Sequence, residues 1–186
     1  MKTISGYILT NILGWEIKGE FPDVKKSIVI FAPHTSYMDA LYGKLAVIEF
    51  GIKYKFISKK KLFFFPLNIA MKLYGSISVG GVNNNNTIHL VSQMFNNARE
   101  LHIIISPEGT RKKVTKWNKG FYSIALRTNV PIVVGYIDYG KKEIGIKGII
   151  DEIKDIDTVM QQINLLYKGV TAKYPENFSL ELKTKM

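Results

Sequence analysis

The sequence predicts an α/β fold: a single domain in which a mixed, mostly parallel sheet is flanked by helices. Its length of 186 residues is typical of one domain, so we treat residues 1–186 as a single unit. Short apolar segments rich in β-branched residues alternate with longer segments that carry a helical pattern. Such an alternation implies parallel strand pairs joined by helices, with functional side chains in the loops that follow the strands.

The strand candidates are short, apolar and rich in Ile and Val, as expected of buried strands: residues 27–32, 54–58, 76–79, 102–105 and 132–137. The segments between them have the spacing of helices: residues 36–50, 65–74, 87–100 and 120–128. We expect residues 143–147 to add an edge strand and residues 157–168 to form a last helix.

Residues 1–20 are expected to contain an N-terminal helix. Its apolar side chains share one helical stripe: Ile4, Tyr7, Ile8, Ile12 and Trp15. Such a helix either docks on the core, which periodicity alone favours, or lies as an interfacial helix on lipid. The densest apolar run, residues 62–67, is much shorter than the roughly 18 residues that a membrane-spanning helix needs. The N-terminus lacks a small-residue cleavage site, so we expect a cytoplasmic protein.

Composition excludes several kinds of site. The chain has no cysteine, which removes disulfides, thiolate nucleophiles and iron–sulfur clusters. Its histidines, His34, His89 and His102, are too far apart in sequence for a local metal-binding motif. We therefore expect no metal and no cofactor.

The net charge of +11 is concentrated in the centre of the chain. No acidic residue lies between Glu49 and Glu100, nor between Glu108 and Asp138, although both stretches carry several basic residues. This distribution favours an anionic partner: nucleic acid, a phosphorylated metabolite, an acidic carrier protein or an anionic membrane surface. The charge alone does not distinguish between these kinds of partner.

The first motif with chemical content is APHTSYMD, residues 32–39, at the end of a predicted strand. A carboxylate such as Asp39 beside His34 would fix the tautomer of the imidazole and stabilise its protonated form, as a general base requires. The alternative is structural: Ser36 caps the next helix, and Asp39 completes a capping box. The motif by itself leaves both interpretations open.

The second motif is ISPEGTR, residues 105–111, which again follows an apolar strand. Pro107 and Gly109 favour a turn that exposes backbone N–H groups. The guanidinium of Arg111 matches the geometry of phosphate oxygens, so the turn suits a phosphorylated substrate. A strand-to-loop turn with a surface ion pair between Glu108 and Arg111 is the alternative.

Together with KKKLFFFP (residues 59–66) and NVPIVV (residues 129–134), these motifs resemble, in the same order, those of the glycerolipid acyltransferases. That family includes enzymes that acylate 1-acylglycerol-3-phosphate. The resemblance implies a glycerol-3-phosphate acyltransferase-like fold and an O-acyltransferase of phospholipid biosynthesis. Its substrates would be a lysophospholipid, most simply 1-acylglycerol-3-phosphate, and acyl-CoA or acyl-carrier protein as the acyl donor.

The resemblance also implies roles for individual residues. His34 would be the catalytic base and Asp39 its orienting partner. The acceptor phosphate would be bound by the second motif: Glu108, Gly109, Thr110 and Arg111. Where the family usually has Val-Asp-Arg, this chain has Val79 followed by Gly80 and Gly81, so the identity of the acceptor stays open.

The basic and aromatic segments would then contact the donor or an anionic membrane, placing the protein on the inner face of the membrane as a peripheral protein. These residues are Lys59, Lys60, Lys61, Phe63, Phe64, Lys112 and Lys113. The alternative function is a non-catalytic, basic module that binds membranes or nucleic acid. It explains the charge but assigns no task to His34, and the signatures of common nucleic-acid-binding folds are absent from the sequence.

Overall fold

Strands and helices alternate along most of the chain in the computed structural model, which describes residues 3–80 and 85–181. The strands are β1 (Glu16–Lys18), β2 (Lys26–Ala32), β3 (Tyr54–Lys59), β4 (Ser76–Val79), β5 (Leu101–Ile105), β6 (Ile132–Asp138) and β7 (Glu143–Ile150). The helices are α1 (Ile4–Tyr7), α2 (Tyr37–Glu49), α3 (Leu67–Tyr74), α4 (Asn85–Asn97), α5 (Gly120–Thr128) and α6 (Ile156–Tyr167). Shorter helical segments are η1 (Ile8–Ile12, a π-helix), η2 (Lys60–Leu62) and η3 (Pro175–Asn177).

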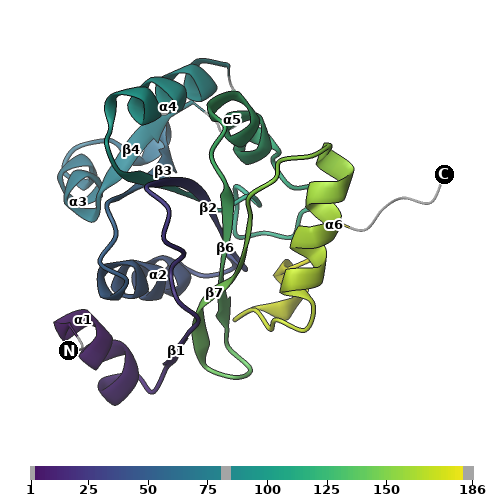
Figure 1. The fold of residues 1–186 in the computed structure, drawn as a ribbon. Helices are drawn as coiled ribbons and strands as arrows, with labels where there is room; N and C mark the ends of the chain where they lie inside the picture. Colours follow the sequence, from purple (N-terminus) through teal and green to yellow (C-terminus); the bar gives the residue numbers. More distant parts are fainter. Residues whose placement is uncertain (1–2, 81–84, 182–186) are drawn as a thin grey trace.

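The strands form a seven-stranded sheet in the order β1-β7-β6-β2-β5-β3-β4 (Figure 1). Neighbouring strands are parallel, except that β6 and β7 are antiparallel. The prediction of an α/β domain with a mixed, mostly parallel sheet is therefore confirmed. Strands β2 and β5, which carry the two sequence motifs at their ends, are direct neighbours.

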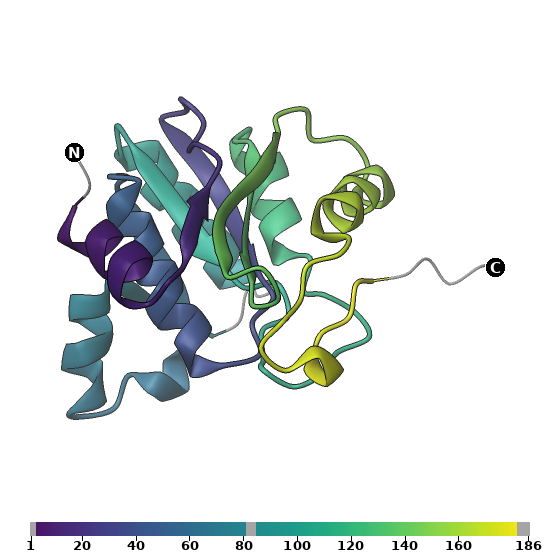
Figure 2. The same ribbon diagram turned by 90° about the horizontal axis from the view of Figure 1, so that it is seen from below.

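The two faces of the sheet are covered unequally. One face packs against α4, α5 and α6 and holds the main core, which includes Ile28 and Ile30 of β2, Phe121 of α5 and Ile163 of α6. The other face is covered mainly by α2 and by the N-terminal segment, seen beside each other in Figure 2. Several side chains on this second face are only partly buried, including Phe31 in the middle of the sheet.

The predicted segments agree with the observed elements to within a few residues, and the strand at 76–79 and the helix at 120–128 have the predicted limits. The prediction that residues 143–147 form an edge strand is wrong. Strand β7 extends from Glu143 to Ile150 and lies inside the sheet, between β6 and β1. The three-residue strand β1 forms the edge beside it, and so short a polar segment gives no strand signal in the sequence.

The N-terminal segment is not a helix throughout residues 1–20. Its helical part ends at Ile12, and Glu16–Lys18 pairs in the sheet as β1. Leu9 and Trp15 are buried and dock this segment on the fold. Ile4 and Ile12 lie on the outer side and are 82% and 66% exposed, so the predicted stripe points mostly away from the core.

Candidate functional site

The two sequence motifs meet at the carboxyl ends of β2 and β5. The register of this parallel pair sets Ile30 opposite Ile105, so the loops that follow start side by side. The backbone N–H of His34 donates a hydrogen bond of 3.0 Å to Oε1 of Glu108. The topology thus brings together two segments that are separated by 74 residues in the chain.

His34 and Asp39 lie beside each other. The distance from Nδ1 of His34 to Oδ2 of Asp39 is 3.7 Å; the histidine side chain is 20% exposed and the aspartate side chain is fully buried. A carboxylate beside Nδ1 favours the tautomer that carries its proton there. Nε2 of His34 is then the nitrogen that can accept a proton from a substrate.

Asp39 also has the structural role that the sequence allowed. Its Oδ2 accepts hydrogen bonds of 2.7 Å from the backbone N–H groups of Thr35 and Ser36. The Ser36 hydroxyl accepts a bond from the N–H of Met38, which completes a capping box at the start of α2. The cap and the contact with His34 are therefore not alternatives, because one carboxylate makes both.

Burial sets the protonation of this site. Desolvation lowers the pKa of His34, with Arg111 also lowering it, although the Asp39 carboxylate acts in the opposite direction. The imidazole is therefore neutral at neutral pH and able to accept a proton. Burial raises the pKa of Glu108 from 4.5 to about 8, because its hydrogen bond from the backbone of His34 only partly compensates for the loss of water.

Glu108 is not placed as the resemblance suggested. The residue is 5% exposed, and its carboxyl group contacts the backbone of His34 rather than lining the cleft. Its Oε2 is buried with no hydrogen-bond partner among the described residues. Glu108 therefore ties the second motif to the loop that holds His34.

Most of the second motif lines a cleft of about 490 Å³, a volume typical of small-ligand sites. Gly109, Thr110 and Arg111 line this cleft together with His34. Gly109 has φ of +65°, and a Cβ there would lie 2.5 Å from the Asn118 side chain, so the turn requires glycine.

Three basic side chains line the cleft. Lys59 of β3 and Lys61 of η2 line it together with Arg111. The Arg111 guanidinium stacks 3.6 Å from the centre of the Tyr37 ring, which restrains its position. A cleft with one imidazole and these cations suits a substrate with both a hydroxyl and a phosphate group.

Other predicted contact residues lie outside the cleft lining. Lys60, Lys112 and Lys113 are exposed near it, Phe64 is exposed, and Phe63 is half-buried. Of the two glycines that depart from the family pattern, Gly80 lines the cleft beside Val79. Gly81 lies outside the described residues.

A family model described as acyltransferase matches residues 15–137 of the chain. The chain belongs to the acyltransferase family. The matched range contains both motifs and the cleft, and membership implies an acyl donor and a lipid acceptor as substrates. It favours acyl transfer over the nucleic-acid-binding alternative. No curated protein matches the chain.

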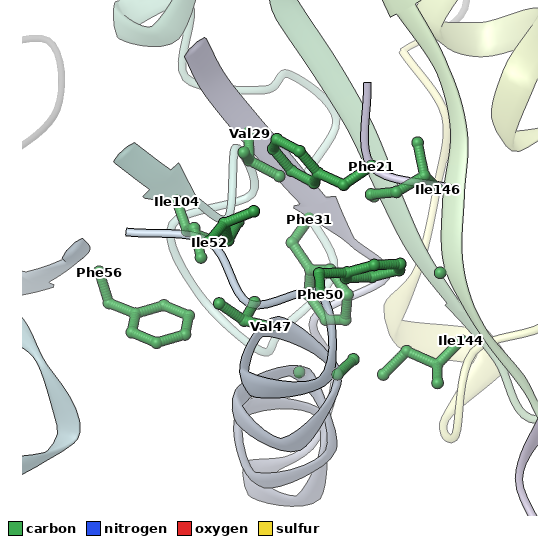
Figure 3. Close-up of a pocket in the computed structure, with 14 residues that line it drawn as sticks. Phe21, Val29, Phe31, Val47, Phe50, Ile52, Phe56, Ile104, Ile144 and Ile146 are labelled. Carbon is green, nitrogen blue, oxygen red and sulfur yellow. The ribbon is translucent and has the colours of Figure 1, made fainter. Parts of the chain in front are cut away.

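In this acyltransferase, a further cavity is lined by His34, and another cavity adjoins that one. The first, of about 110 Å³, is lined by His34, Asp39, Ser58 and Tyr74 and extends to Phe31 and Phe56. The second, of about 30 Å³, lies between α2 and the sheet and is lined only by apolar side chains and glycines (Figure 3). The residues that line both cavities are Phe31, Gly43, Phe56 and Ile104.

Phe31 is one of the residues that lie between these two cavities. Its ring fills space that two glycines leave free: a Cβ at Gly43 of α2 would lie 3.3 Å from the ring, and one at Gly135 of β6 would lie 3.2 Å from it. Any larger residue at either position would press on the ring. The Phe31 ring therefore forms part of the wall between the cavity beside His34 and the apolar cavity, together with Phe56 and Ile104.

Sequence reasoning missed several residues that contact the site. The Tyr139 hydroxyl donates a hydrogen bond to Oδ1 of Asp39, and the Arg111 guanidinium stacks on the Tyr37 ring. Neither contact leaves a signal in the sequence, because each depends on which segments the fold places together. Across the described residues, no group of three or more His, Cys, Asp or Glu is arranged to hold a metal ion. No helix in that part of the chain is both long and apolar enough to cross a membrane.

Proposed function

We propose that this acyltransferase moves a fatty acyl group from acyl-CoA or acyl-carrier protein to the hydroxyl of a lysophospholipid, most simply 1-acylglycerol-3-phosphate. The observation that carries the proposal is the placement of a neutral imidazole, backed by a buried carboxylate, in a cleft lined by Arg111, Lys59 and Lys61. This arrangement combines a base for a hydroxyl with charges for a phosphate group.

In the proposed reaction, Nε2 of His34 accepts the proton of the acceptor hydroxyl. The oxygen attacks the carbonyl carbon of the thioester, and a C–O bond forms as the C–S bond breaks. The departing sulfur takes the proton back from the imidazolium and leaves as a thiol, so no charge is left on the enzyme. Asp39 stabilises the imidazolium while it exists, because its carboxylate faces Nδ1.

The acceptor phosphate would lie against Arg111 and the lysines of η2 and β3. The guanidinium is held on the Tyr37 ring, which lowers the entropy lost when it binds phosphate. Gly80 in the cleft wall leaves space where the family usually carries a larger polar side chain. This difference leaves room for a lysophospholipid other than 1-acylglycerol-3-phosphate, so the acceptor panel below includes both kinds.

The acyl chain would enter the cavity behind His34 and point towards Phe31. This direction follows from the chemistry of the walls, which are polar at His34 and Ser58 and apolar at Phe56 and Ile104. The adjoining apolar cavity is small, so a longer chain must displace the Phe31 ring to enter it. Phe31 would therefore limit the length of chain that is accepted.

An exposed apolar surface next to the cleft supports action at a membrane. Helix α3 has no buried residue, and Ile69 and Leu73 are 53% and 80% exposed. Phe64 and Phe65, in the preceding turn, are 60% and 78% exposed beside Lys59, Lys60 and Lys61. Apolar side chains flanked by lysines are suited to the surface of an anionic bilayer.

The test is acyl transfer by the purified protein with a panel of lyso-acceptors, using acyl-CoA and acyl-carrier protein as donors. We expect thiol release that depends on a phosphorylated lyso-acceptor. His34→Ala should reduce the rate by about 10²- to 10⁴-fold, the usual contribution of a general base. Undiminished transfer by His34→Ala, or no transfer to any lyso-acceptor, would contradict the proposal.

Membrane contact is tested separately by sedimentation with vesicles that contain anionic lipid. We expect binding that weakens as salt is added and that a Leu73→Ser, Phe65→Ser double variant largely loses. Equal binding of the double variant and the unchanged protein would rule out this surface as the contact.

A further inference from the structure

A tyrosine-to-carboxylate contact reaches Asp39 from outside the family-matched range. Tyr139 lies beyond residue 137, where the match ends, and its hydroxyl donates a 2.6 Å hydrogen bond to Oδ1 of Asp39. The other carboxylate oxygen, Oδ2, faces Nδ1 of His34. The hydroxyl of Tyr139 and the imidazole of His34 thus engage the two oxygens of one carboxylate.

The Tyr139 ring is held firmly. It packs edge-on against Trp15, with 5.0 Å between ring centres, and its backbone N–H donates to the carbonyl of Thr171. Burial raises the pKa of its hydroxyl well above the usual value, and the bond to Asp39 raises it further, so the hydroxyl stays protonated and donates. A rigid ring presents this donor to Asp39 at a fixed position.

Residues 139–181 also contact a group that bonds to Oδ2, the other oxygen of the Asp39 carboxylate. The backbone N–H of Tyr174 donates to the Thr35 hydroxyl, and the backbone N–H of Thr35 donates to Oδ2 of Asp39. Further along, Glu181 accepts a bond from the backbone of Trp117, in the loop that follows the second motif. Residues 139–181 therefore contact the loops of both motifs.

We propose that Tyr139 is a positioning residue for the proposed acyl transfer, fixing the Asp39 carboxylate against His34 from a segment outside the family-matched domain. The backbone N–H groups of Thr35 and Ser36 hold Oδ2, and the Tyr139 hydroxyl holds Oδ1, so the carboxylate plane is fixed at both oxygens. Without the hydroxyl, the plane can turn about the bonds to Oδ2 and change the contact with Nδ1 of His34. The inference rests on the proposed function only for its kinetic test.

Among the described residues, the following charged and titratable groups lie around His34, Asp39 and Tyr139. Asp39 and Arg111 face His34, and Glu108 bonds to its backbone. Tyr42 and Tyr174 lie near Tyr139, and the Lys173 ammonium is 6.0 Å from its ring centre. The Asp39 carboxylate raises the pKa of His34, so a Tyr139→Phe variant whose carboxylate has moved away from Nδ1 should have a lower pKa at His34.

The test compares Tyr139→Phe with Tyr136→Phe. The control also removes a tyrosine hydroxyl that bonds to a carboxylate, that of Glu143. We expect Tyr139→Phe to lower kcat by about 10- to 100-fold, as a misplacement of ~1 Å does, with little change in KM. Its kcat/KM profile should keep activity down to a lower pH than that of the unchanged protein, and Tyr136→Phe should alter neither quantity.

A titration of the His34 imidazole by NMR gives a readout that does not depend on the substrate. A fall in the pKa of His34 in Tyr139→Phe alone supports the inference, even if the lyso-acceptors of the proposed function fail. An unchanged or raised pKa in Tyr139→Phe would overturn it. So would a rate loss that Tyr136→Phe shares, because that loss would reflect a general structural effect.

Discussion

Replacing Asp39 by Asn separates the two roles of its carboxylate. The side chain is fully buried and accepts bonds of 2.7 Å from Thr35 and Ser36 and of 2.6 Å from Tyr139. An amide has one oxygen, so its NH₂ group must face either the two backbone donors or the Tyr139 hydroxyl. Losing one hydrogen bond to a charged group costs about 1.5–3 kcal/mol, so we expect unfolding to become easier by about 2 kcal/mol.

The loss of rate in Asp39→Asn should be larger than this loss of stability suggests. Without the carboxylate, His34 loses both its preferred tautomer and the charge that stabilises its protonated form. We expect acyl transfer to fall by about 10²- to 10⁴-fold at a temperature where the variant is folded. Denaturant unfolding and thiol release, measured under the same conditions, give the two quantities.

Ser36→Ala is the matched control for Asp39→Asn. It removes the hydroxyl that caps α2 and should cost about 1 kcal/mol, but it keeps the Asp39 carboxylate beside His34. Its rate should stay within a few-fold of that of the unchanged protein. The reasoning is refuted if Asp39→Asn retains most of its activity, or if Ser36→Ala loses as much activity as Asp39→Asn.

The remaining predictions concern the cleft, the pH response and the acyl chain. Arg111→Ala should raise the KM for a phosphorylated acceptor by about tenfold and change kcat little. Steady-state kinetics that show a fall in kcat with an unchanged KM would contradict this. Because desolvation lowers the pKa of His34, kcat/KM should hold its plateau down to below pH 6.5, and a midpoint above 6.5 would contradict this. Folding raises the pKa of Glu108 from 4.5 to about 8, so between these pH values the folded state binds more protons than the unfolded state. The free energy of unfolding should therefore fall as pH rises from 4.5 to 8, by up to about 1.4 kcal/mol per pH unit. Glu108→Gln should remove this slope in denaturant unfolding, and an unchanged slope would assign it to another group. Phe31→Ala should shift donor preference towards longer acyl chains, whereas Phe50→Ala, which lines only the inner cavity, should not; identical chain-length profiles would disprove the role of Phe31.

The positions of the two motifs could be predicted because they depend on local rules. Ile and Val in short runs mark buried strands, and the loops after such strands carry functional residues in α/β folds. Ser36 and Asp39 have the spacing of a capping box, which is a property of a few consecutive residues. The structure confirms this cap, and it shows that the same carboxylate lies beside His34.

The role of Glu108 could not be predicted in the same way. The sequence places it in a turn beside Arg111, where an exposed ion pair or a contact with substrate is the natural expectation. In the structure it turns inward to the backbone of His34, because β2 and β5 are neighbours in register. A contact across 74 residues depends on strand order, which no local pattern specifies.

The amino-acid sequence by itself determined the alternation of strands and helices, the cap of α2 and the identity of the residues in the two motifs. These features follow from hydrophobic period, turn chemistry and side-chain chemistry over a few residues. Only the tertiary structure decided that β7 lies inside the sheet, that α3 leaves its apolar side chains exposed and that Tyr139 reaches Asp39. Each of these depends on how distant segments share the limited surface of one core, where the burial of one element determines what is left uncovered on another.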